Sequence, residues 1–87
     1  MKYDLKKIAN DLVLRKYGKL MKEKKDYFYD KPLIYKIKYI ENSNGVFFEF
    51  EFSIEDERSK YCMGHIYNGQ IFYGIEGSLS TVRITEE

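Results

Sequence analysis

The sequence predicts an α+β protein: one N-terminal amphipathic helix packed on one face of a four- or five-stranded antiparallel β-meander. Three observations carry this prediction. Apolar residues recur at spacings of three and four near the N-terminus, apolar and polar residues alternate between Leu33 and Ile54, and Asn-Gly pairs stand at Asn44-Gly45 and Asn68-Gly69. Short connections favour antiparallel pairing of successive strands, and one helix can cover only one face of their sheet. The length of 87 residues predicts a single domain.

We expect the helix to span about residues 4–24, with Asp4 as its N-cap. Its predicted apolar stripe consists of Leu5, Ile8, Ala9, Leu12, Val13, Tyr17, Leu20 and Met21. Gly18 interrupts the pattern, because glycine costs about 1 kcal/mol relative to alanine inside a helix. The alternative is therefore a first helix that ends near Tyr17.

Strands are predicted at about 33–40 and 46–54, with Asn44-Gly45 as a type I′ turn. Paired positions would then sum to 89, whereas a four-residue loop would make them sum to 87. Both registers place Leu33, Tyr35, Ile37 and Tyr39 on the apolar face with the phenylalanines, and both pair lysines with glutamates.

Further strands are predicted at about 60–67, 70–75 and 79–84. The first two form a hairpin around Asn68-Gly69, with paired positions summing to 137. In this register Gly64 faces Tyr73, whose ring is expected to cover the gap that the glycine leaves.

Charge distribution, cysteine content and apolar runs limit the kinds of partner and the cellular location that we expect. Residues 1–27 carry a net charge of +5 and residues 28–87 a net charge of −4, so a basic helix precedes an acidic sheet. Cys62 is the one cysteine, which excludes an internal disulfide and favours a cytoplasmic protein. No signal-like segment and no apolar run of transmembrane length is present, so we expect no membrane partner.

The sheet face that the helix leaves uncovered is the first candidate site. It would carry Ile34 and Ile40, the charged Lys36, Lys38, Glu49 and Glu51, and six candidate partner-binding residues: Phe47, Tyr61, Met63, His65, Tyr67 and Phe72. An aromatic patch rimmed by charge is typical of a protein-binding surface. The alternatives are that the sheet curls and buries these rings itself, or that the face assignment is wrong. A homodimer through this face, or through a strand edge, is a further form of the same hypothesis.

Nucleic-acid binding is the rival function. The basic side of the helix offers five candidate phosphate contacts: Lys7, Arg15, Lys16, Lys19 and Lys22. However, Glu49 and Glu51 stand among the aromatic residues of the sheet, where they would repel phosphates, and no basic-glycine-aromatic RNA-binding signature is present.

Enzymatic function has little support in the sequence, and we predict no catalytic residue, no metal and no cofactor. Cys62 and His65 could form a nucleophile and base, but this spacing in a strand points them to opposite faces. Tyr61, His65, Tyr67 and Arg83 could serve a small ribonuclease, although only their residue types suggest it. Glu55-Asp56-Glu57 lacks the ligand spacing of a calcium loop.

Two resemblances bear on function. A helix gripped by an antiparallel meander is similar in layout to the cystatin family, and Gln70-Ile71-Phe72-Tyr73-Gly74 resembles the family's Q-x-V-x-G hairpin, with Phe72 in the place of valine. The family's second-loop tryptophan is absent, so its protease-inhibitor activity is not carried over. Size and composition also resemble small phage and mobile-element proteins of low-GC Gram-positive bacteria, which often block a larger host protein. The sequence therefore favours a non-enzymatic protein-binding module, such as an inhibitor or immunity-type factor with a larger protein partner.

Overall fold

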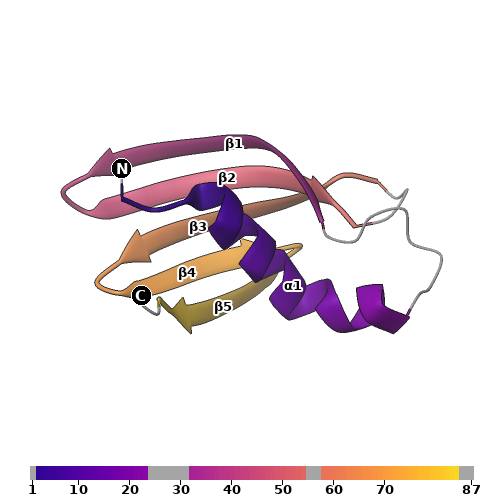
Figure 1. The fold of residues 1–87 in the computed structure, drawn as a ribbon. Coiled ribbons are helices and arrows are strands. Elements are labelled where there is room, and N and C mark those ends of the chain that lie inside the picture. The colour runs from indigo at the N-terminus through magenta and orange to yellow at the C-terminus, as the bar shows by residue number, and fades with distance from the viewer. Residues whose placement is uncertain (1, 24–31, 55–57, 85–87) are drawn as a thin grey trace.

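The structure is a computed structural model, which describes residues 2–23, 32–54 and 58–84. One helix and five strands follow one another: α1 (Leu5–Glu23), β1 (Leu33–Asn42), β2 (Gly45–Ser53), β3 (Lys60–Tyr67), β4 (Gln70–Ile75) and β5 (Ser78–Arg83). The strands form one antiparallel sheet in the order β1-β2-β3-β4-β5, so each strand pairs with its neighbours in sequence (Figure 1). The predicted α+β meander is confirmed, with all five strands in a single sheet.

Helix α1 begins where the sequence predicted and is continuous through Gly18. The Asp4 carboxylate accepts a hydrogen bond from the backbone N–H of Lys7 at 3.2 Å, and the Asp4 carbonyl accepts one from Ile8 at 3.0 Å. These bonds satisfy donors that a helix N-terminus otherwise leaves unpaired. The alternative of a helix that ends near Tyr17 is wrong.

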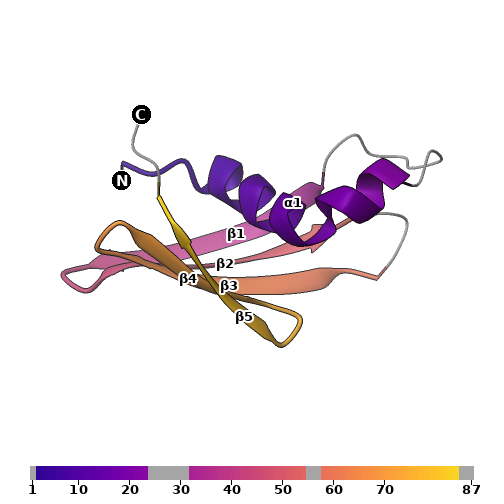
Figure 2. The same cartoon turned by 90° about the horizontal axis from the view of Figure 1, so that it is seen from below.

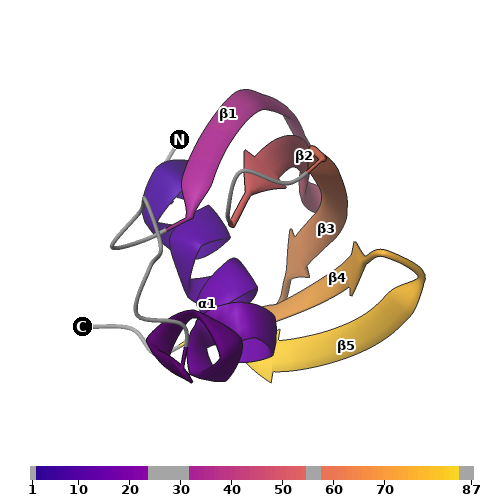
Figure 3. The same cartoon turned by 90° about the vertical axis from the view of Figure 1, so that its right-hand side faces the viewer.

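The sheet curls around α1, which crosses the strands obliquely on the concave face (Figures 2 and 3). The core lies between them, and its largest fully buried side chains are Phe50, Phe52, Leu12, Ile54, Ile66, Ile75, Val13 and Cys62. Alternate residues of β2 and β3 supply much of this core, because side chains of a strand point to opposite faces with a period of two. Burial of these apolar groups against α1 is the main stabilising term of the fold.

The turn between β1 and β2 differs from the predicted type I′ turn. Asn42 pairs with Gly45, so Ser43 and Asn44 are the central residues, and among these four residues only Gly45 has a positive φ, 107°. The Asn42 side chain accepts a hydrogen bond from the Asn44 backbone N–H at 2.8 Å, which closes the turn locally. Paired positions near the turn therefore sum to 87, the second of the two predicted registers.

A β-bulge then shifts this register by one. The pairing changes between Tyr35 and Lys38, and within the bulge Lys36 has a φ of 54°. Beyond it, Ile34 pairs with Phe52 and packs against the core, whereas Tyr35 pairs with Glu51 on the opposite face. The predicted faces of Leu33, Ile34 and Tyr35 are therefore wrong, because the extra residue in the bulge moves the side chains beyond it to the opposite face of the sheet.

The hairpin of β3 and β4 has the predicted register throughout, with Ile66 opposite Ile71 and Cys62 opposite Ile75. Its turn also has the predicted type, since Asn68 and Gly69 both have a positive φ. Gly64 pairs with Tyr73 as predicted, but the expectation that the Tyr73 ring covers it is wrong. A Cβ on Gly64 would lie 2.2 Å from Cζ of Phe48, so the Phe48 ring, rather than Tyr73, fills that gap.

We therefore predict that Gly64→Ala destabilises the protein by roughly 1–3 kcal/mol, because the added methyl group overpacks a buried ring. Gly74→Ala is the matched control on the next strand. Its Cβ would meet Cδ2 of Leu79 at 3.2 Å, at the end of an exposed side chain, and the Ser78 carbonyl oxygen at an ordinary contact distance of 3.8 Å. Urea denaturation of both variants measures the difference, and equal stabilities would contradict this packing.

Candidate binding face

The face opposite α1, called the convex face below, is built from two adjacent rows of side chains across the strands. Because neighbouring strands pair directly, the first row runs Phe47–His65–Phe72–Thr81 from β2 to β5. The second row runs Glu49–Met63–Gly74–Leu79. Paired side chains in a sheet lie about 4.5–5.5 Å apart, so the first row is a continuous surface, whereas Gly74 interrupts the second.

The structure places the predicted partner-binding residues together on this face. Five of the six are between 41% and 57% exposed, namely Phe47, Tyr61, Met63, Tyr67 and Phe72. His65 is half-buried between its neighbours. The alternative in which the curled sheet buries these rings is therefore wrong. The sheet curls toward α1, on its other face (Figure 3).

His65 lies at the centre of the aromatic residues. Its ring stacks on Phe47 with centroids 4.0 Å apart and 6° between the planes, and Tyr67 and Phe72 lie at 5.8 and 6.4 Å. Its Nε2 is 2.6 Å from the Asn44 carbonyl oxygen, which makes Nε2–H the donor. This contact holds the His65 ring against the β1–β2 turn.

The acidic residues of the convex face have partners of their own. The Tyr61 hydroxyl donates a hydrogen bond to the Glu49 carboxylate, and this bond raises the pKa of Tyr61 above its usual value of 10.0. Glu51 forms an ion pair with Lys36 at 3.1 Å, and Lys38 stands directly opposite Glu49 in the register of β1 and β2. These contacts place a band of charge along the β1 side of the aromatic residues.

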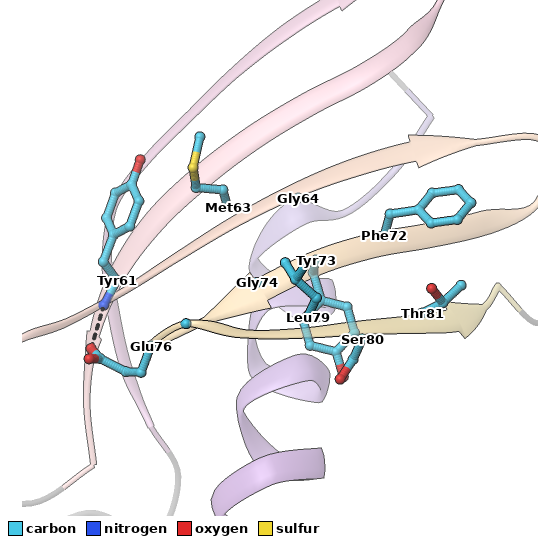
Figure 4. A pocket seen from close by; sticks show the side chains of 11 residues that line it. Tyr61, Met63, Gly64, Phe72, Tyr73, Gly74, Glu76, Leu79, Ser80 and Thr81 are labelled. Atoms are coloured by element: carbon cyan, nitrogen blue, oxygen red, sulfur yellow. Dashed lines mark hydrogen bonds between the residues drawn. The ribbon is translucent and has the colours of Figure 1, made fainter.

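A hollow opens beside the aromatic row, between β3 and β5 (Figure 4). Gly74 has no side chain at its centre, Met63 lies on one side, and Leu79 leans over from β5. The open volume is about 1040 Å³. Leu79 is 88% exposed and was missed by sequence reasoning, although its alternation with Thr81 and Arg83 places it on this face.

Cys62 and His65 do not act together. Cys62 is fully buried in the core, whereas His65 lies on the convex face. Among the described residues, no group of three or more His, Cys, Asp and Glu side chains could hold a metal ion. Glu55, Asp56 and Glu57, which sequence analysis considered for a cation, lie outside the described residues.

The basic residues of α1 lie among carboxylates, and one of them contacts the sheet. Lys7 and Arg15 line a cleft with Lys2 and Arg83, and the carboxylates of Asp4 and Asp11 line the same cleft. The Lys16 ammonium group donates to the Ile75 carbonyl at 3.2 Å and lies 5.7 Å from the Tyr17 ring centroid, so it supports the fold. Lys19 is exposed, and the Lys22 side chain lies outside the described residues.

Comparison with known proteins adds no relative: no protein-family model, curated protein or solved structure matches the chain. The segment that resembles the cystatin hairpin, Gln70–Gly74, lies within strand β4 rather than at a hairpin tip. Among the described residues, no helix has the length and apolar character of a transmembrane span.

The buried thiol gives a prediction about chemical reactivity and pH. Burial raises the pKa of Cys62 from 9.0 to about 12, so the folded protein keeps the thiol neutral. We expect Cys62 to react with a thiol reagent at pH 8 only after unfolding in guanidinium chloride. Because the unfolded thiol ionises near pH 9 while the folded thiol stays protonated, its contribution to stability falls as the pH rises above about 9. Rapid labelling of the native protein would contradict the buried position.

Proposed function

We propose that the protein is a small non-enzymatic binding module that docks its convex face on a larger protein. The observation that carries this proposal is the contiguous, exposed set of large side chains on a face that no described element covers. Monomeric proteins rarely leave such a patch unused. Tyrosine and other aromatic side chains also dominate the binding energy of many protein interfaces.

The fixed positions of the aromatic side chains support this proposal. His65 is held by Phe47 and by the Asn44 carbonyl, and strands hold the rings on both sides. A surface ordered in advance loses little conformational entropy when it binds. Steric occlusion by this face would suit a cytoplasmic inhibitor or immunity-type factor, since a domain of 87 residues blocks a partner simply by covering it.

Nucleic-acid binding through α1 is less well supported. Lys16 is engaged with the sheet, and carboxylates share the cleft of Lys7 and Arg15. A phosphate backbone would meet both signs of charge there, whereas nucleic-acid interfaces are strongly positive.

The proposal is tested by selecting peptides from a displayed random library on the immobilised protein. Tyr67→Ala/Phe72→Ala should weaken the selected binders about 30-fold or more, the equivalent of about 2 kcal/mol, since hot-spot aromatics contribute at least that much. Leu14→Ala/Leu20→Ala is the matched control, because these leucines are similarly exposed but lie on α1.

Two results would contradict the proposal. One is that the binders survive loss of Tyr67 and Phe72. The other is that an oligonucleotide binds with an affinity that falls steeply with salt and is lost in Lys19→Glu/Lys22→Glu, as the rival function requires. Light scattering of the same samples shows whether the face instead joins two copies of the chain, which a dimer dissociated by the Tyr67 and Phe72 substitutions would indicate.

A further inference from the structure

The turn between β4 and β5 contains an unfavourable residue. Glu76 and Gly77 have φ values of 49° and 83°, the two positive angles of a type I′ turn. The β3–β4 turn has the same pattern at Asn68 and Gly69, with the residues that favour it. Glutamate has a Cβ and a long side chain, and such residues rarely adopt the left-handed region. The fold therefore tolerates strain at Glu76 that asparagine would relieve.

The carboxylate of Glu76 has a weak partner in the structure. One oxygen accepts a hydrogen bond from the Tyr61 backbone N–H at 3.4 Å, the long end of the hydrogen-bond range, and the residue is exposed. Glu76 lines the hollow next to Tyr61 (Figure 4). Among the described residues that line the hollow, its carboxylate is the only charged group.

The rest of the hollow is suited to an apolar side chain. Gly74 adds no side chain at its centre, where Leu79 leans over from β5, Met63 lies on the other side, and Phe72 lines the end away from Glu76. Leu79 is the most exposed large apolar residue of the described chain, so covering it would remove apolar surface from water. A carboxylate at one end of an apolar hollow is complementary to a ligand with an apolar group and a cation.

We propose that this hollow binds a segment of the partner protein in which a large apolar side chain stands beside a lysine or arginine. The apolar side chain packs against Met63 and Leu79 beside Gly74, and the cation pairs with Glu76. This inference rests on the proposed function and adds the chemistry of the partner. It also explains why glutamate stands in a turn that asparagine would suit better.

A displayed random peptide library is the probe, and three charge variants are compared with the wild type. Glu76→Lys reverses the charge at the hollow. Glu41→Lys makes the same change in net charge on an exposed residue of β1, outside the hollow. Glu76→Asn removes the charge and relieves the positive-φ strain, so it should raise the urea midpoint while it abolishes charge selection.

Wild type and Glu41→Lys are expected to enrich peptides with Lys or Arg next to Leu, Met, Phe or Trp, by tenfold or more over the unselected library. Glu76→Lys is expected to favour Asp or Glu at the same place. Gly74→Ala, which fills the hollow at little structural cost, should weaken the wild-type binders about tenfold.

Other outcomes overturn the inference. Binders that depend on Tyr67 and Phe72 but show no charge preference, or the same preference in Glu76→Lys, would leave the proposed function standing and remove the partner chemistry. Loss of stability in Glu76→Asn with unchanged peptide selection would assign Glu76 a structural role only. A complete absence of binders that depend on the convex face would overturn both proposals.

Discussion

The fold depends on one constraint: a strand sends alternate side chains to opposite faces, and one helix covers only one of those faces. In β2, Phe48, Phe50 and Phe52 are buried against α1, so Phe47, Glu49 and Glu51 must face the other way. The same rule in β3 buries Cys62 and Ile66 and exposes Met63 and Tyr67. The exposed aromatic face is therefore a consequence of how the core is built, and the choice of large apolar residues for it requires a separate explanation.

Ordinary solubility would favour polar residues at those exposed positions. The β1 side of the convex face follows that expectation in part, because Lys36, Lys38, Glu49 and Glu51 lie there in pairs, although Ile40 beside Phe47 is 67% exposed. The β3–β5 side does not, because Met63, Phe72 and Leu79 surround a hollow there. A difference of this kind within one face is typical of a binding surface with an apolar centre and a charged rim.

The sequence was most informative where local chemistry decides the structure. Asp4 caps α1 because its side chain accepts from the helix N-terminus, and Asn68-Gly69 fixes the β3–β4 register because both residues accept a positive φ. The faces of Leu33, Ile34 and Tyr35 could not be predicted, because the bulge at Lys36 inverts them and no sequence pattern indicates a bulge there, whereas the rest of β1 has the predicted faces. The ring that covers Gly64 was also not predicted, since it is Phe48 of β2 rather than Tyr73, the paired residue of β4.

The central claim is that the aromatic residues opposite α1 are surface rather than core. Urea unfolding of Phe50→Ala and Phe72→Ala tests it most directly, because the two phenylalanines undergo the same chemical change on opposite faces of the sheet. Phe50 is 1% exposed and Phe72 is 44% exposed. The account predicts that Phe50→Ala lowers the free energy of unfolding by roughly 3–5 kcal/mol and Phe72→Ala by less than half as much. Equal losses would mean that Phe72 belongs to a core, and the convex face would then not be a free binding surface.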